Sequence, residues 1–172
     1  LASRGWNRPP RILNIGLGSG VTLEHLAEEP ADRLVSVEIS AGILEANRTV
    51  LRKELFDASE IEHVRADGRH YLLLEDVRWD LIVASPSWAV EMASGRLLTV
   101  EFFQLARSRL TEDGVFALWV DSFDKTDEDV EIVVRTLHSV FPAVQGWGLE
   151  TGSMIFVASP APFDRSGLQL ER

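Results

Sequence analysis

Short apolar runs alternate along the chain with segments in which apolar residues recur every three or four positions. The first pattern is typical of buried strands and the second of amphipathic helices. The runs predict strands at Arg11–Leu17, Arg33–Ile39, Ile61–Ala66, Trp79–Ala84 and Val115–Val120. The helical periodicity predicts helices at Val21–Glu29, Ala41–Arg52, His70–Glu75, 100–110 and Asp127–Phe141.

Capping and turn residues support these boundaries. Ser40 and Thr99 stand where helix N-caps are expected, and Thr126 with Asp129 resembles a capping box. Glu112–Gly114 predicts a turn before the fifth strand. Two further strands, Val144–Leu149 and Ser153–Ala158, are joined by a hairpin-like connection.

Strand–helix alternation with short turns predicts an α/β fold, with a doubly wound, mostly parallel sheet covered on both faces. The terminal hairpin makes it a Rossmann-like sheet of seven strands with an antiparallel end. Ligands of such sheets bind in a crevice at the carboxyl ends of the strands, where the strand order reverses. The whole chain, 1–172, is predicted to be one domain, with a core over 10–160 and a tail over 161–172.

Composition narrows the class of protein. The 172 residues include no cysteine, which excludes disulfide scaffolds, zinc knuckles and thiol catalysis. The formal net charge of −10 argues against a nucleic-acid-binding face. No apolar run approaches the length of a membrane span, so this segment is not expected to contact a membrane. The four histidines lack metal-ligand spacing, and no metal is predicted.

A glycine-rich turn follows the first strand. Gly16, Gly18 and Gly20 lie between a strand and a helix, and Glu38 ends the second strand about twenty residues later. Glycines allow a tight turn and close approach of a ligand, while the acid is placed to accept hydrogen bonds from ribose hydroxyls. Because position 21 is Val21, the dinucleotide spacing is not matched, which disfavours a nicotinamide or flavin enzyme.

Several motifs in order resemble the spermidine synthase family, over about residues 10–160. They are Ile15–Leu23, Val37–Ser40, Ala66–Arg69, Trp79–Val83, Leu98–Phe103, Arg107–Leu110 and Gly114–Trp119. The resemblance implies the fold of S-adenosylmethionine-dependent methyltransferases, with S-adenosylmethionine or its decarboxylated form as cofactor. It implies cofactor contacts from Gly16, Gly18, Ser19, Gly20, Glu38, Ile39, Asp67 and Gly68, with Glu38 on the ribose and Asp67 with Gly68 on the adenine.

The chain departs from this family where the catalytic acids are expected. Aminopropyltransferases carry two aspartates after the fourth strand, and the matching residues here are Ala84 and Ser87. Loss of a general base typically costs about 10²–10⁴-fold in rate. Asp121 and Asp124, after the fifth strand, are candidates to replace the missing acids; the alternative is a solvated acidic loop.

The sequence therefore predicts a spermidine-synthase-like transferase domain in which aminopropyl transfer itself is doubtful. A methyltransferase is the first alternative, because methyl transfer depends mainly on proximity and alignment. A non-catalytic ligand-binding or interaction domain of a larger protein is the second. The expected partner is a small molecule such as an amine, not nucleic acid. We also expect a cytoplasmic location and a homodimer. The resemblance further suggests that this segment is fused to a membrane region in the full-length protein.

Overall fold

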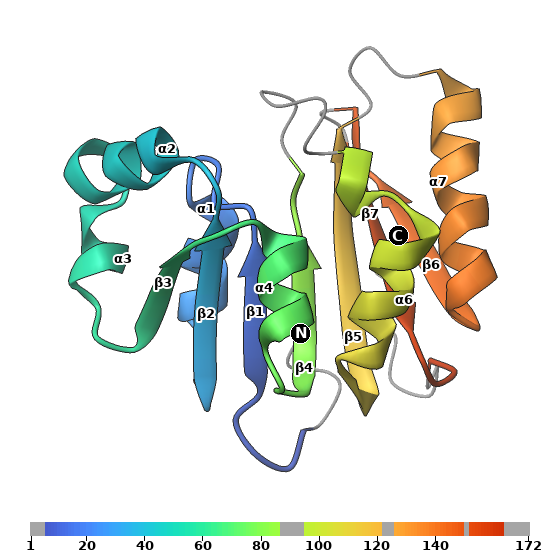
Figure 1. Cartoon of the computed structure of the whole chain (residues 1–172), viewed down its shortest axis with the longest axis horizontal. Helices are drawn as coiled ribbons and strands as arrows, with labels where there is room; N and C mark the ends of the chain where they lie inside the picture. The colour runs from blue at the N-terminus through green and yellow to red at the C-terminus, as the bar shows by residue number, and fades with distance from the viewer. Residues whose placement is uncertain (1–5, 87–94, 122–125, 150–151, 164–172) are drawn as a thin grey trace.

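The computed structural model describes residues 6–86, 95–121, 126–149 and 152–163. It contains one seven-stranded sheet in the order β3-β2-β1-β4-β5-β7-β6 (Figure 1). The strands are β1 (Arg11–Ile15), β2 (Arg33–Glu38), β3 (Ile61–Arg65), β4 (Trp79–Ala84), β5 (Leu110–Asp121), β6 (Ala143–Gly148) and β7 (Ser153–Ser159). The helices are α1 (Val21–Ala27), α2 (Ala41–Ala46), η2 (Asn47–Leu51), α3 (Lys53–Asp57), α4 (Gly68–Leu74), η4 (Gly95–Leu97), α6 (Val100–Ser108) and α7 (Asp127–Val140).

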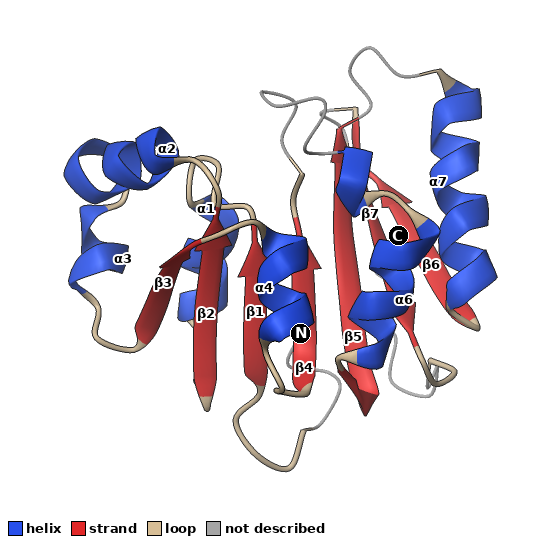
Figure 2. Cartoon of the chain, in the orientation of Figure 1, coloured by secondary structure: helices blue, strands red, loops and turns tan. Residues whose placement is uncertain are grey.

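Helices cover both faces of the sheet (Figure 2). On one face, Leu13, Ile15 and Ile82 pack in a core with buried residues of α4, α6 and α7, among them a group of aromatic rings. On the other, Ile12 and Leu81 pack with residues of α1 and α3. Alternate residues of one strand thus enter opposite cores, which explains why β1 and β4 carry apolar residues on both faces.

The pairing confirms the predicted fold class. β1 to β5 pair in parallel, while β7 is antiparallel to both β5 and β6. The strand order reverses between β1 and β4, so the loops after these two strands leave the sheet in different directions. In sheets of this kind, ligands bind at that point, outside the carboxyl ends of the strands. This is the upper edge of the sheet in Figure 1.

One predicted helix differs in type and one predicted turn is wrong. The segment expected as a helix over Ala41–Arg52 is helical to Leu51, but it changes at Asn47 from the α-helix α2 to the π-helix η2, and the separate helix α3 follows it. The predicted turn Glu112–Gly114 lies inside β5, which begins at Leu110. There the register is irregular, because the step from Trp79 to Leu81 on β4 matches the longer step from Leu110 to Val115.

The predicted caps are confirmed. The side chains of Ser40, Thr99 and Thr126 each accept a hydrogen bond from a backbone amide in the first turn of the following helix. Thr126 and Asp129 form the reciprocal capping box. Among the described residues, no helix is long and apolar enough to cross a bilayer.

Candidate functional site

The glycine turn after β1 has a backbone that only glycine adopts readily. Gly16, Gly18 and Gly20 have φ values of 89°, 53° and 82°. A Cβ atom on Gly16 would lie 2.6 Å from the carbonyl oxygen of Ser85, and one on Gly20 would lie 2.7 Å from Asn47 Oδ1. No heavy atom lies within 4 Å of the Cβ position of Gly18 among the described residues. Gly16 and Gly20 therefore serve close packing, whereas Gly18 borders open space.

Hydrogen bonds fix most backbone groups of this turn. The Gly16 amide donates to Val37 O (2.8 Å), and the Gly20 amide donates to Leu17 O (2.9 Å). The Gly16 carbonyl accepts from Asn14 Nδ2, and the Gly18 carbonyl accepts from Asn47 Nδ2. Within the described part of the chain, the amides of Gly18 and of the exposed Ser19 donate no hydrogen bond. These two donors remain available to a ligand.

Glu38 is buried at the carboxyl end of β2, with 5% of its surface exposed. Its Oε2 accepts a hydrogen bond from the Leu17 amide and its Oε1 one from the Ser40 amide, both at 2.8 Å. A carboxylate has about four acceptor positions. The two amides thus orient the Glu38 carboxylate beside the glycine turn and leave about two acceptor positions for a ligand.

The other predicted cofactor residues lie along the same edge of the sheet. Ile39 follows Glu38 and is 48% exposed, which leaves an apolar surface beside the acid. Asp67 caps α4, accepting a hydrogen bond from the His70 amide (2.9 Å). Its neighbour Gly68 has a clear packing role, since a Cβ there would lie 2.2 Å from Ile15 Cγ2.

Of the four positions predicted for catalysis, the structure describes Ala84 and Asp121. Ala84 ends β4 in register with Ile15 of β1 and Leu118 of β5. The side-chain oxygen of the next residue, Ser85, is buried without a partner among the described residues. Asp121 ends β5 opposite Ser153 of β7, at the same edge of the sheet. Ser87 and Asp124 lie outside the described residues.

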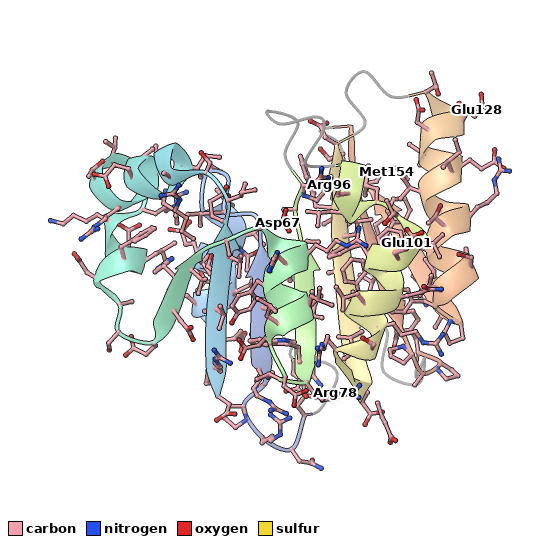
Figure 3. All side chains as sticks on the ribbon, viewed as in Figure 1. Asp67, Arg78, Arg96, Glu101, Glu128 and Met154 are labelled. Carbon is pink, nitrogen blue, oxygen red and sulfur yellow. The ribbon has the colours of Figure 1, made fainter. Side chains whose placement is uncertain are left out.

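Charged side chains also lie on the elements that follow β4. Figure 3 labels Asp67 at the start of α4, Arg96 in η4 and Glu101 in the first turn of α6. The backbone amide of Glu101 and the Thr99 hydroxyl hold the pKa of the Glu101 carboxyl below its ordinary value, and Arg69 adds to this lowering. The Glu101 carboxyl therefore stays ionised to a lower pH than an ordinary glutamate.

Two buried asparagines support the turn, and sequence reasoning missed both. Asn14, in β1, is 1% exposed, and Asn47, at the start of η2, is 0% exposed. Each donates to a carbonyl of the glycine turn, and each has an Oδ1 atom without a partner among the described residues. A polar residue inside an apolar strand was the available signal for Asn14. Nothing in the sequence distinguishes Asn47 from its exposed neighbours.

Comparison with known families identifies the family to which this chain belongs. A family model described as "Methyltransferase domain" matches residues 12–114, which run from the second residue of β1 into β5 and include the glycine turn and Glu38. The chain belongs to the methyltransferase-domain family. This agrees with the strand order and with the methyltransferase-type fold predicted above.

Within this methyltransferase-domain family, the chain is similar to curated aminopropyltransferases. It is 32% identical over 147 residues to a polyamine aminopropyltransferase of Synechococcus sp. (strain JA-2-3B'a(2-13)), covering 82% of this chain and 47% of that protein. It is 29% identical over 137 residues to the polyamine aminopropyltransferase of Thermotoga maritima, covering 78% and 46%. The chain thus spans about half the length of these relatives.

Solved structures of spermidine synthases have a fold similar to that of this chain. The spermidine synthase from Thermotoga maritima superimposes with a TM-score of 0.76 at 25% identity, covering 89% of this chain and 54% of that one. A spermidine synthase in complex with the transition state analogue AdoDATO gives a TM-score of 0.75 at 25% identity, with the same coverages. Human methyltransferase-like protein 13 in complex with SAH gives a TM-score of 0.72 at 22% identity, covering 94% of this chain and 76% of that one. At this identity the comparison supports the fold alone.

Proposed function

We propose that this methyltransferase-fold domain binds an adenosyl sulfonium compound, S-adenosylmethionine or its decarboxylated form, and transfers a group from it to a small acceptor. The observation that carries the proposal is the Glu38 carboxylate, buried and oriented by the amides of Leu17 and Ser40. A carboxylate with acceptor positions to spare suits the two hydroxyl donors of a ribose.

The surroundings of Glu38 suit the rest of such a nucleoside. The exposed face of Ile39 offers apolar area for a base, and Asp67 is a pure acceptor for an adenine amino group. The amides of Gly18 and Ser19, beside the open space at Gly18, suit the polar groups of the sulfonium substituent. Similarity to spermidine synthases, one of them bound to AdoDATO, supports this choice of ligand class.

The group transferred is the second part of the proposal. In either reaction a nucleophile attacks a carbon bonded to the sulfonium, that carbon–sulfur bond breaks, and a neutral thioether leaves. Aminopropyl transfer to a polyamine needs a base, because the attacking amine is mostly protonated at neutral pH. Ala84 provides none where the relatives' family carries its first aspartate. This favours methyl transfer, which depends mainly on proximity and alignment; Asp121 and Asp124 are the alternative bases.

The test is isothermal titration calorimetry with S-adenosylmethionine, its decarboxylated form, methylthioadenosine and a nicotinamide dinucleotide. We expect the adenosyl thioether and sulfonium compounds to bind and the dinucleotide not to bind. Preference for S-adenosylmethionine supports methyl transfer, and preference for the decarboxylated form supports aminopropyl transfer. Absence of binding by all three adenosyl compounds overturns the proposal.

A Glu38→Gln variant locates the site. We expect nucleoside affinity to fall by about 10–100-fold, because charge-assisted hydrogen bonds contribute roughly 1.5–3 kcal/mol each. Glu45→Gln, on the exposed side of α2, is the matched control and keeps wild-type affinity. Equal affinity of the Glu38→Gln variant and the control would place the ligand elsewhere.

A further inference from the structure

The inference concerns Asn47, the first residue of η2. Its amide is completely buried, whereas the next residues, Arg48, Thr49 and Val50, are exposed. Asn47 Nδ2 donates to the carbonyl of Gly18 at 2.8 Å and to the carbonyl of Ile43 at 3.0 Å. Both of its amide protons are therefore used, one within its own helix and one across to the glycine turn.

The π-helix brings a second side chain against the same turn. The Arg52 amide donates to the Asn47 carbonyl at 2.9 Å, which is the five-residue spacing of a π-helix. A Cβ atom on Gly20 would lie 2.7 Å from both Asn47 Oδ1 and Arg52 Cγ. Arg52 also forms an ion pair with Glu24 of α1 at 3.3 Å. Asn47 and Arg52 thus occupy the space that the bare α-carbon of Gly20 leaves.

A single side-chain bond fixes the middle of the turn in the described part of the chain. Gly16 is tied to β2 and Asn14, and Gly20 is tied to Leu17 and to the start of α1. Between them, the Gly18 carbonyl has the Asn47 amide as its hydrogen-bond donor. The orientation of the Gly18–Ser19 peptide, and with it the direction of the Ser19 amide, therefore depends on Asn47.

We propose that Asn47 is a positioning residue for the nucleoside site: it touches no ligand and orients the Gly18–Ser19 peptide whose amide meets the ligand. The predicted effect on ligand affinity rests on the proposed function. The hydrogen bond by which Asn47 fixes the Gly18 carbonyl does not depend on that function. A peptide fixed before the ligand arrives loses less freedom on binding, so affinity should depend on Asn47.

Two measurements on Asn47→Ala and Asn47→Asp test this. Amide hydrogen exchange, without ligand, should show faster exchange of the Gly20 amide, which donates to Leu17 O and ends the Gly18–Gly20 segment. Affinity for the nucleoside that the wild type binds should fall about tenfold or more. Thr49→Ala is the matched control, because Thr49 is exposed on the same π-helix and its hydroxyl donates to Glu45 within the same helical segment.

The Asn47→Asp variant provides a readout that a purely structural role would not change. Its new carboxylate, when ionised, has no donor for the Gly18 carbonyl, whereas the protonated carboxyl has an O–H donor. Affinity of this variant should therefore rise as pH falls through the pKa of the introduced carboxyl, which burial places above its usual value. The wild type should show no such rise over the same range.

The outcomes separate the two proposals. If the wild type binds no adenosyl compound, the proposed function fails, and hydrogen exchange still decides whether Asn47 holds the turn. If Asn47→Ala melts at a lower temperature but keeps wild-type exchange in the turn and wild-type affinity, Asn47 is only a packing residue and the inference is overturned. If Asn47→Asp does not fold, the exchange and affinity of Asn47→Ala decide alone.

Discussion

At the residue scale, the bare α-carbon of Gly68 lets two elements approach closely. A Cβ there would lie 2.2 Å from Cγ2 of Ile15, a β-branched and fully packed side chain at the end of β1. Since Gly68 also opens α4, a displacement here would reach both the carboxyl end of β1 and the cap at Asp67. Packing of the core and placement of the predicted adenine contact are therefore coupled at this residue.

We predict that Gly68→Ala lowers the free energy of unfolding by about 1–3 kcal/mol, because overpacking forces neighbouring atoms to shift. Gly42→Ala is the matched control, in the first turn of α2. A Cβ there would meet Ser40 Oγ at 3.8 Å as its nearest described neighbour, so alanine should stabilise the helix by up to about 1 kcal/mol. Urea denaturation measures both. Equal stabilities of the two variants would contradict this account of Gly68.

The residues of the candidate site differ in how far the sequence could predict them. Gly16, Gly18, Gly20 and Glu38 are adjacent to predictable strand ends, so pattern and spacing were sufficient to place them. Asn47 was not predictable, because its burial depends on the π-turn and on the missing side chain of Gly20. The residues predicted to meet the substrate follow β4 and β5, where the sequence has no regular apolar pattern from which to predict a structure.

At the scale of elements, three arginines cap the helices of one face. Arg109 donates to the carbonyls of Leu72 and Leu73 at the end of α4. Arg78 donates to Ser108 at the end of α6, and Arg107 donates to Val140 at the end of α7. A helix C-terminus has unpaired carbonyls and a partial negative charge, and a guanidinium satisfies both. These three caps lie away from the candidate site; Figure 3 shows Arg78 at the opposite edge of the sheet.

We predict that Arg109→Gln lowers the free energy of unfolding by about 1–3 kcal/mol, since it leaves carbonyls of α4 without a donor. Arg135→Gln is the control: Arg135 is exposed on α7 and forms an ion pair with Glu131 one turn away, worth about 0.5 kcal/mol at most. Chemical denaturation should separate the two. A loss no larger than that of Arg135→Gln would show that the Arg109 cap contributes nothing.

Helix and strand positions were predicted well and some boundaries poorly, for physical reasons. Apolar period and caps fixed the strands and the starts of α2, α6 and α7 to within a few residues. The change from α-helix to π-helix after Ala46 was missed, because apolar positions continue through Leu51 and no glycine or proline marks it. Tertiary contacts of Asn47 and Arg52 with the glycine turn accompany this change.

At the scale of the whole molecule, an ionic cluster joins β2, β3 and α4 near the amino ends of the strands. Arg33 forms ion pairs with Glu62 (2.9 Å) and Glu75 (3.0 Å). Its Cζ atom lies 5.4 Å from the centroid of the Trp79 ring. Its guanidinium also donates to the Tyr71 hydroxyl. Burial raises the pKa of Tyr71 to about 12, against an opposing effect of Arg33. The cluster therefore links the stability of the sheet to alkaline pH.

We predict that part of the stability is lost as pH rises from about 10 to about 12. A phenol whose folded pKa lies above its unfolded value stabilises the fold below the unfolded pKa, and this contribution disappears as pH rises through the folded pKa. Tyr71 is the single tyrosine, so phenolate absorbance follows it alone. Its midpoint should lie well above 10, and Tyr71→Phe should flatten the fall of melting temperature with pH. A midpoint near 10 would contradict this.

The position of β7 has a consequence for how the chain folds during synthesis. β7 lies between β5 and β6 and pairs with both, so β6 has no partner strand in this sheet until β7 has been made. At about 5–20 residues per second, β5 is complete roughly 2–8 seconds before β7. During that interval the apolar run Val115–Val120 has an open edge, to which another nascent chain can pair. Slow translation between residues 121 and 153 would lengthen this exposure and favour aggregation over folding.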